Sequence, residues 1–180
     1  MFEITLLMER QFPSSMEKKR YESRFFFVIL YSIIILGVVA SNSDPTSIAA
    51  GKDSGSLSDL NLALMGVGVG MILLGLIIRF AAIGTLKKNF SSRLRIREGH
   101  TLVTNGVYHR LRHPAYLGLI LLILGIPVLL SSVLGFLVML LIVPLLIHRI
   151  KLEEVMLIGQ FGNEYENYMR QTKRLIPFLY

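Results

Sequence analysis

The stretch AYLGLILLILGIPVLLSSVLGFLVMLLIVPLLI, residues 115–147, runs for 33 residues without a charge. A single helix of that length would be about 50 Å long at 1.5 Å per residue, well beyond the roughly 30 Å hydrocarbon core of a bilayer. Ser131 and Ser132 stand near its midpoint, shortly after Pro127, and residues of these types favour a turn. The stretch therefore predicts a hairpin of two transmembrane helices.

The composition of the whole chain agrees with a membrane protein. Its 180 residues are 53% hydrophobic and 17% charged, whereas about a quarter of the residues in a soluble domain are charged. Further uncharged stretches occur at 25–40 and 60–78, before the hairpin at 116–130 and 133–147. Several are shorter than the roughly 20 residues that span a bilayer, so they must extend into flanking residues or tilt. We expect an all-α polytopic membrane protein with about four transmembrane helices.

The net charge of +7 indicates how the four uncharged stretches are oriented in the membrane. Five lysines and arginines precede the first stretch, one lies between the first and second, and eight lie between the second and third. None lies in the hairpin turn, and five follow the fourth stretch. Eighteen of nineteen therefore lie on one side, which the positive-inside rule makes the cytoplasmic one. Both termini are then cytoplasmic and nucleic-acid binding is not needed as an explanation. The membrane would be the plasma membrane of a prokaryote or the endoplasmic reticulum of a eukaryote.

The N-terminal half carries few chemical signals. Gly66 and Gly70 form a small-xxx-small spacing that predicts close helix packing, and no G-x-G-x-x-G register is present. Residues 41–59 are typical of an exposed connector without chemistry. The absence of cysteine excludes a disulfide framework, a thiolate metal site and a cysteine nucleophile. We divide the chain into 1–84, with the first two transmembrane helices, and 85–180, with the functional core.

The first polar block, residues 87–116, contains two structural signals. Asn105 and Gly106 form a turn dipeptide, and Pro114 fits the first turn of a helix, with His113 as its cap. Such a helix start, with free N–H groups, suits an anion. Pro114 also interrupts the spacing of His109 and His113, so no metal site is expected.

The second polar block, residues 148–180, begins where the fourth stretch ends. Arg149 and Glu153 are four apart and share a helix face, while Glu154 and Lys151 should point elsewhere. A hairpin would bring Arg149 to the same membrane face as His113. A simpler account is also open, in which Arg149 is a snorkelling anchor or forms a surface ion pair with Glu153.

Two segments carry a resemblance to a known family. GHTLVTNGVYHRLRHPAYLG (99–118) and RIKLEEVMLIGQFGNEYENYMRQTKRLIPF (149–178), separated by the hairpin, resemble the isoprenylcysteine carboxyl methyltransferase family. The similarity covers about residues 85–178. It implies an S-adenosylmethionine site on the cytoplasmic side that is not a Rossmann fold. Eukaryotic members of that family have a glutamine seven residues before the first motif's histidine, where this chain has Arg93.

The resemblance also implies roles for individual residues. Arg149 would hold the substrate carboxylate, and Arg112 and His113 would be catalytic with it. The cofactor would be lined by His100, Thr101, Leu102, Val103, Tyr108, His113, Pro114, Ala115, Tyr116 and Glu153. The substrate would be a prenylcysteine or similar lipidic carboxylate held in the bilayer. Such a carboxylate is ionised at neutral pH, so its methylation needs orientation and a cation, and no general base.

Three alternatives remain open on the sequence. N-methylation of a phospholipid amine would require loss of a proton and hence a base. An NADPH-dependent reductase of the same wider clan would be a much longer chain. In a non-catalytic membrane scaffold, the charged blocks would only anchor helices. Binding of S-adenosylhomocysteine, and the base lability of a methylated product, distinguish these possibilities.

Overall fold

The computed structural model describes residues 25–45, 47, 59–86 and 101–175, and their regular structure is helical apart from one isolated bridge. The first helix is Phe25–Ser43. The elements that follow are α2 (Asp59–Leu86), η3 (Gly106–His109), α3 (Pro114–Leu129), α4 (Val133–Leu140), α5 (Ile142–Phe161) and α6 (Asn163–Gln171). The expected all-α architecture is therefore confirmed within these ranges.

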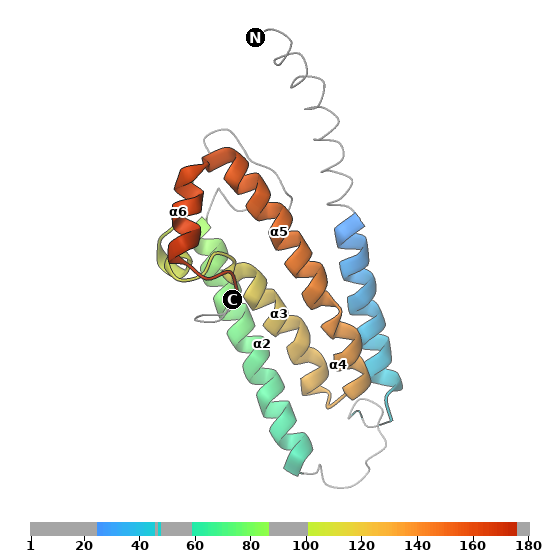
Figure 1. Ribbon diagram of the computed structural model, residues 1–180. Helices are drawn as coiled ribbons and strands as arrows, with labels where there is room; N and C mark the ends of the chain where they lie inside the picture. The colour runs from blue at the N-terminus through green and yellow to red at the C-terminus, as the bar shows by residue number, and fades with distance from the viewer. Residues whose placement is uncertain (1–24, 46, 48–58, 87–100, 176–180) are drawn as a thin grey trace.

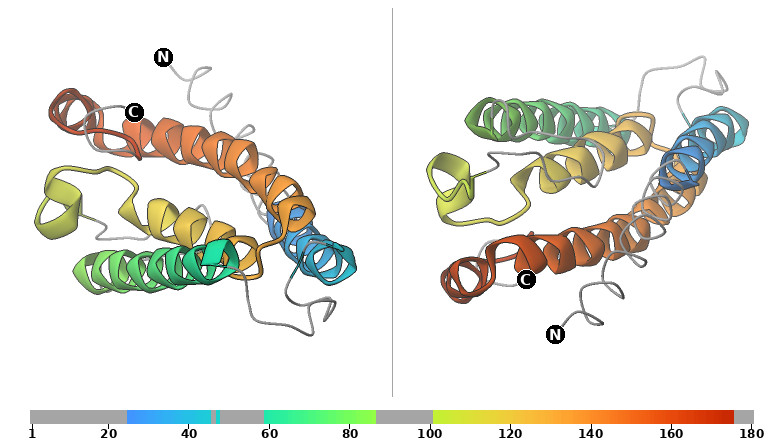
Figure 2. Two further views of the ribbon diagram at one scale, coloured as in Figure 1. Left: turned by 90° about the horizontal axis from the view of Figure 1, so that it is seen from below. Right: turned by 90° about the horizontal axis from the view of Figure 1, so that it is seen from above.

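The long helices form a bundle with two distinct edges (Figures 1 and 2). One edge is α2 packed against α3, and the other is the first helix beside α4 and α5. The end that carries η3, α6 and the C-terminal segment is called the polar end here. The end that carries the connection between α3 and α4 is called the turn end.

Among the described residues, three helices are long and apolar enough to cross a membrane. They are the first helix, α2, and the nearly continuous Val133–Phe161 that contains α4 and α5. The remaining apolar helix, α3, has 16 residues and is shorter than a full span. Of the four stretches expected to span, the third thus falls short in length, although the predicted hairpin is formed.

The turn of the hairpin lies where the sequence predicts it. The N–H groups of Ser131 and Ser132 donate to the carbonyls of Val128 and Pro127, which closes α3 with a Schellman motif. Ser131 occupies the left-handed position, with φ 52°, that glycine usually takes. Ser132 then caps α4 by accepting from the Gly135 N–H at 3.0 Å. Two adjacent serines therefore end one helix and begin the next.

Pro144 accounts for the break between α4 and α5. A proline lacks an N–H, and its ring clashes with the carbonyl four residues earlier, here that of Leu140. The helix tightens at this point, where the Leu141 N–H donates to the Val138 carbonyl. The result is one bent helix from the turn end to the polar end.

The antiparallel contact between α2 and α3 is made by glycines of both helices. A Cβ built on Gly75 would lie 2.7 Å from the Gly118 carbonyl oxygen, and one built on Gly118 would lie 2.6 Å from the Gly75 oxygen. Gly68 meets the backbone of Leu129 in the same way. Gly66 and Gly70 make no such contact with the described residues of the chain, because a Cβ at either position would meet nothing within 4 Å. These two lie on the opposite face of the helix.

Asp44 and Ser47, directly after the first helix, bind the turn end, which corrects the expectation of an exposed connector for these two residues; residues 46 and 48–58 lie outside the described part of the chain. Asp44 Oδ2 accepts hydrogen bonds from the Ser132 hydroxyl and the Leu134 N–H, both at 2.9 Å. The Ser47 hydroxyl donates to the Leu130 carbonyl at 3.0 Å. Asp44 thus adds a second cap to α4 from a distant part of the chain. This contact fixes one end of the first helix to the hairpin.

The core lies between the two edges of the bundle. Its buried side chains come from the first helix, α3, α4 and α5: Leu30, Ile123, Met139, Ile142 and Leu146. α5 itself buries a row of residues spaced by four, which is one face of a helix. That row leads from the apolar core directly into the polar end.

Candidate active site

The N-terminus of α3 is built as its sequence predicts. Pro114 occupies the first helical position and His113 the cap, with the His113 carbonyl accepting from the N–H groups of Tyr116 and Leu117. His113 is buried, and its ring lies edge-on to that of Tyr116 at 5.8 Å. This geometry aims Tyr116, one turn into the helix, toward α5.

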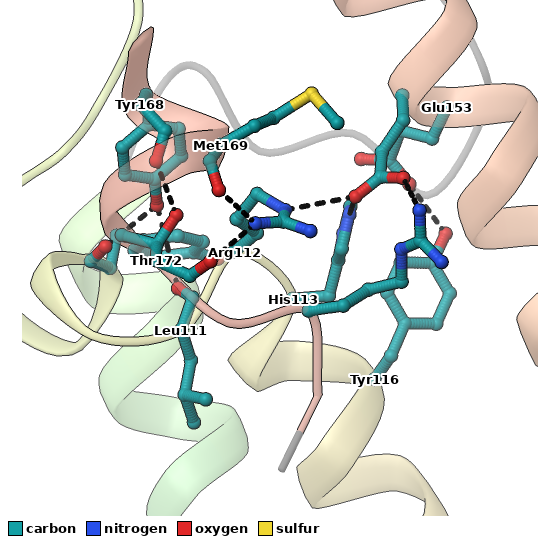
Figure 3. A network of polar contacts seen from close by, with 11 residues as sticks. Leu111, Arg112, His113, Tyr116, Glu153, Tyr168, Met169 and Thr172 are labelled. Carbon is teal, nitrogen blue, oxygen red and sulfur yellow. Dashed lines mark hydrogen bonds and ion pairs between the residues drawn. The ribbon is translucent and has the colours of Figure 1, made fainter. Parts of the chain in front are cut away.

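A buried carboxylate on α5 contacts two arginines and a histidine at this point (Figure 3). Arg112 Nε donates to Glu154 Oε1 at 3.0 Å, and Arg174 Nη2 donates to Oε2 at 2.6 Å. His113 Nε2 lies 3.4 Å from Oε1. Glu154 is only 4% exposed, and removing a buried charge from water is costly unless it is paired and hydrogen-bonded. This cluster therefore joins α5 to the start of α3.

The expectation that Glu154 points away from the site is wrong. Ile142, Leu146 and Ile150 are buried and each is four residues from the next, and Glu154 continues the same row. This regular spacing was the signal in the sequence that could have identified Glu154 as buried. Arg149 and Glu153 each directly precede a residue of this row, so they lie on the adjacent face of α5.

The C-terminal segment is attached to the start of α3 by its backbone. The N–H groups of Arg112 and His113 donate to the carbonyls of Lys173 and Arg174, and the Lys173 N–H donates to the Arg110 carbonyl. Arg112 Nη1 also donates to the carbonyls of Met169 and Thr172 (Figure 3). Arg112 therefore holds Glu154 with one nitrogen and the end of α6 with another.

The short η3 helix directs Tyr108 inward. Its hydroxyl is buried, and burial first, then the nearby Glu153 carboxylate, raises the pKa of Tyr108 well above its usual value. The Tyr168 hydroxyl donates to the Tyr108 carbonyl at 2.6 Å, and burial raises the pKa of Tyr168 to about 12. Both tyrosines are therefore neutral hydrogen-bond donors at physiological pH.

A second polar group lies beside the Glu154 cluster and includes Arg149 and Glu153. The Tyr116 hydroxyl donates to Glu153 Oε2 at 2.8 Å (Figure 3). The Arg149 guanidinium lies close enough to the same hydroxyl to interact with it. Arg149 is only 3% exposed, and its guanidinium carbon is 4.7 Å from the centre of the Phe26 ring. Arg149 is thus enclosed in the bundle and is not a snorkelling anchor at its surface.

The structure brings most of the predicted site residues together. Arg112, His113 and Tyr116 meet α5 directly, as the hairpin geometry requires, and Tyr108 lies next to them. Leu102 and Val103 are half-buried and Thr101 is exposed. His100, the first predicted cofactor contact, lies outside the described residues, as does Arg93.

Two residues of the N-terminal helices also reach this region. Arg79 of α2 donates through Nη1 to the Ala115 carbonyl at 3.1 Å and interacts electrostatically with Tyr108. Phe26 of the first helix covers Arg149. The sequence could have pointed to Arg79, because a charged residue within an apolar membrane helix is rare and usually functional. Nothing in the sequence marks Phe26 among its neighbours Phe25 and Phe27.

Among the described residues no group of three or more histidine, cysteine or acidic side chains is placed to hold a metal ion. The polar end instead offers carboxylate, guanidinium, imidazole and phenol groups beside an apolar core. Such a set suits a charged organic ligand at the boundary between water and membrane.

The fold and the site define a class of protein: an all-α membrane protein with a polar site at one end of its bundle, between the helix start at 113–116 (HPAY) and the charged residues of α5. The chain belongs to the isoprenylcysteine carboxyl methyltransferase (ICMT) family, whose sequence model matches residues 68–159.

Curated relatives of the chain are named protein-S-isoprenylcysteine O-methyltransferases. The chain is 34% identical over 116 residues to the probable protein-S-isoprenylcysteine O-methyltransferase of Oryza sativa subsp. indica, covering 63% of this chain and 61% of that protein. It is 34% identical over 119 residues to the Mus musculus protein-S-isoprenylcysteine O-methyltransferase, and this match covers 64% of this chain and 42% of the mouse protein. The matched region thus spans about half the length of these relatives.

A solved structure shares the fold. The eukaryotic intramembrane Ras methyltransferase ICMT matches with a TM-score of 0.60 and 33% identity, over 65% of this chain and 43% of that one. At this identity and score the similarity extends beyond the general arrangement of membrane helices.

Proposed function

We propose that this protein is an integral membrane methyltransferase that uses S-adenosylmethionine to esterify the carboxylate of a prenylated cysteine or a similar lipidic acid. The observation that carries the proposal is the arrangement of Arg149, Glu153 and Tyr116. A buried cation and a carboxylate one helical turn apart converge on the tyrosine of the HPAY motif. The family and the named relatives support the same activity.

The donor set of the site fits this cofactor. A carboxylate can accept about four hydrogen bonds, and the bond from Tyr116 uses one of the acceptor positions of the half-buried Glu153. An ammonium group or ribose hydroxyls can therefore donate hydrogen bonds to the other acceptor positions of the Glu153 carboxylate. We assign cofactor binding to Glu153 and Tyr116, with Tyr108, Pro114 and Ala115 beside them. His100, Thr101, Leu102 and Val103 complete the set that the family resemblance implies.

The reaction requires little acid–base chemistry from the protein. S-adenosylmethionine supplies an electrophilic methyl group when bound. Arg149 holds the substrate carboxylate, and its burial in the helix bundle limits the access of water to the reacting atoms. The carboxylate is already ionised, so the site provides orientation and no base. We assign Arg112 and His113 a supporting role at the site, because Glu154 engages both.

The proposed location follows from the same geometry. The polar end faces the cytoplasm, where the soluble cofactor is present, and the apolar tail of the substrate stays in the bilayer beside the helices. Residues 85–180 supply the cofactor-binding core. Arg79 and Phe26 show that the helices of residues 1–84 also contribute side chains to its surroundings.

Ligand binding separates the proposed activity from its alternatives. S-adenosylhomocysteine should raise the Tm of the purified protein and NADPH should not; the opposite result indicates a reductase, and no shift with either indicates a scaffold. Tritiated methyl transfer to N-acetyl-S-farnesylcysteine should give a base-labile ester. A base-stable product from a phospholipid amine would instead indicate N-methylation.

Variants on one helix test the assigned roles. Arg149→Ala should mainly raise KM for the lipidic acid, and Glu153→Ala should mainly weaken binding of S-adenosylhomocysteine. Lys151→Ala is the matched control, because Lys151 is exposed on the same helix. Wild-type behaviour of both Arg149→Ala and Glu153→Ala contradicts the assignment.

A further inference from the structure

The Phe26 ring covers the cation to which we assign the substrate carboxylate. The guanidinium carbon of Arg149 lies 4.7 Å from the Phe26 ring centre and 5.9 Å from that of Phe27. Such distances are typical of a cation–π contact. With Arg149 only 3% exposed, a carboxylate arriving from the membrane can contact it only if a neighbouring group moves.

Two neighbours of Arg149 differ in how firmly they are held. Tyr116 is tied to Glu153 by its hydroxyl and belongs to α3, whose first residues are fixed by the Glu154 cluster. Phe26 belongs to the first helix, at the edge of the bundle (Figure 2). Val28 and Tyr31 of that helix are 63% and 60% exposed. Phe26 is therefore the group that moves at least cost.

We infer that Phe26 is a gate, and that its ring exchanges with the substrate carboxylate over Arg149; this inference rests on the proposed function. The guanidinium exchanges the face of a ring for a charged oxygen, so it is never left in apolar surroundings without a partner. The displaced ring moves toward the membrane side of the first helix. An acid with an apolar tail replaces the contacts that the ring gives up, whereas a small soluble acid does not. Phe26 thereby selects for lipid-linked acids.

The chain contains no tryptophan, so Phe26→Trp places a single tryptophan, which can be excited apart from the tyrosines, over Arg149 while keeping a ring that binds cations well. The variant is studied in nanodiscs saturated with S-adenosylhomocysteine. N-acetyl-S-farnesylcysteine should change the emission, and its methyl ester should not, because the ester has no negative charge to displace the ring. Tyr31→Trp is the control on the same helix, and its emission should not distinguish acid from ester.

Kinetics provide a second measurement. Phe26→Leu removes the competing ring, so KM for the farnesylated acid should fall about twofold to thirtyfold, as expected for a cation–π contact to a buried cation. Phe26→Tyr retains the ring face and should restore the wild-type KM. Tyr31→Leu should leave KM unchanged. Wild-type affinity of all variants for S-adenosylhomocysteine shows that each is folded.

The results separate the gate from the proposed function. Equal emission responses to acid and ester, or the same KM for Phe26→Leu and Tyr31→Leu, would overturn the gate while wild-type methyl transfer upholds the enzyme. If the wild type neither binds S-adenosylhomocysteine nor transfers methyl groups, the proposed function itself fails. A response to the acid alone, with a lowered KM in Phe26→Leu, supports the gate.

Discussion

The two edges of the bundle are packed in different ways. At the α2–α3 edge, glycines bring backbone against backbone, with Gly75 facing Gly118. At the other edge, the first helix contacts α4 and α5 through side chains, with Gly37 against Met139 and Phe26 against Arg149. Backbones in contact cannot separate without moving whole helices, whereas side chains can change rotamer. One edge is therefore fixed and the other adjustable.

This difference matches the demands of the proposed reaction. The fixed edge includes α3, which carries Tyr116 toward the proposed cofactor, and Arg79, which binds the first turn of α3. The adjustable edge covers Arg149, which a membrane-borne substrate must reach. Groups that bind the shared cofactor benefit from a rigid support, while the substrate entrance requires movement.

The largest expected effect comes from the ion cluster that joins the two edges at the polar end. Glu154→Ala leaves Arg112, His113 and Arg174 without their common carboxylate, and breaking a buried ion pair costs about 3–5 kcal/mol. Because the Arg174 side chain is 21% exposed, we expect about 3 kcal/mol, measured by denaturant unfolding in mixed micelles.

The neighbouring position provides the control for this loss. Val155→Ala removes a side chain that is 68% exposed and should change the free energy of unfolding by less than about 0.5 kcal/mol. Glu154→Gln keeps the shape without the charge and should fall between the two. If Glu154→Ala proves as stable as Val155→Ala, the cluster does not join the edges.

A smaller loss is expected from a methyl group at the fixed edge. Gly118→Ala places a Cβ 2.6 Å from the Gly75 carbonyl oxygen and 2.9 Å from the Arg79 nitrogen, so the helices must shift, at a cost of about 1–3 kcal/mol. Gly70→Ala adds the same group where nothing lies within 4 Å, and should stabilise α2 by up to about 1 kcal/mol. Equal Tm values for the two variants would contradict backbone contact at this edge.

The local features that depend on short sequence patterns could be predicted. The turn at Ser131 and Ser132 and the helix start at Pro114 follow from the conformational limits of a few adjacent residues. These features fix the hairpin, and the hairpin alone requires that His113 and α5 meet. The structure confirms that meeting, because His113 Nε2 lies 3.4 Å from Glu154 Oε1 of α5.

The errors arose where the orientation of a helix had to be known. Gly66 and Gly70 have a familiar spacing, but the buried residues Gly68, Gly75 and Ala82 repeat every seven residues, as Gly118 and Gly125 do on α3. In an apolar helix all faces have similar hydrophobicity, so the sequence does not show which row meets a partner. The contacts of Asp44 with Ser132 and of Phe26 with Arg149 join segments about 90 and 120 residues apart, which local patterns cannot predict.

The adjustable edge is anchored at the turn end, and this anchor can be loosened separately. Asp44→Ala removes the acceptor of two hydrogen bonds, from the Ser132 hydroxyl and the Leu134 N–H. Loss of a buried partner of this kind costs about 1–3 kcal/mol, and we expect about 1.5 kcal/mol in the unfolding measurement. Asn42→Ala, on an exposed side chain that bonds locally to the Val38 carbonyl, should cost far less. A similar loss in both variants would show that Asp44 does not anchor the helix.

The smallest expected effect is a methyl group at the adjustable edge. A Cβ on Gly37 would lie 2.5 Å from Cγ of Met139, closer than the 2.6 Å that separates the Gly118 Cβ from a carbonyl oxygen. Methionine has three rotatable bonds and can fill a changed space, and alanine favours the helix by about 1 kcal/mol over glycine. Gly37→Ala should therefore leave the free energy of unfolding within about 1 kcal/mol of wild type.

Distance alone would predict the reverse order of Gly37→Ala and Gly118→Ala, so the pair tests whether the atom that is met, backbone or flexible side chain, decides the cost. The free energies of unfolding of the two variants are compared in the same mixed micelles. If Gly37→Ala destabilises the protein as much as Gly118→Ala, the first helix is as firmly held as α2. The Phe26 ring could then leave Arg149 only by its own rotation, because a shift of the helix that carries it would be too costly.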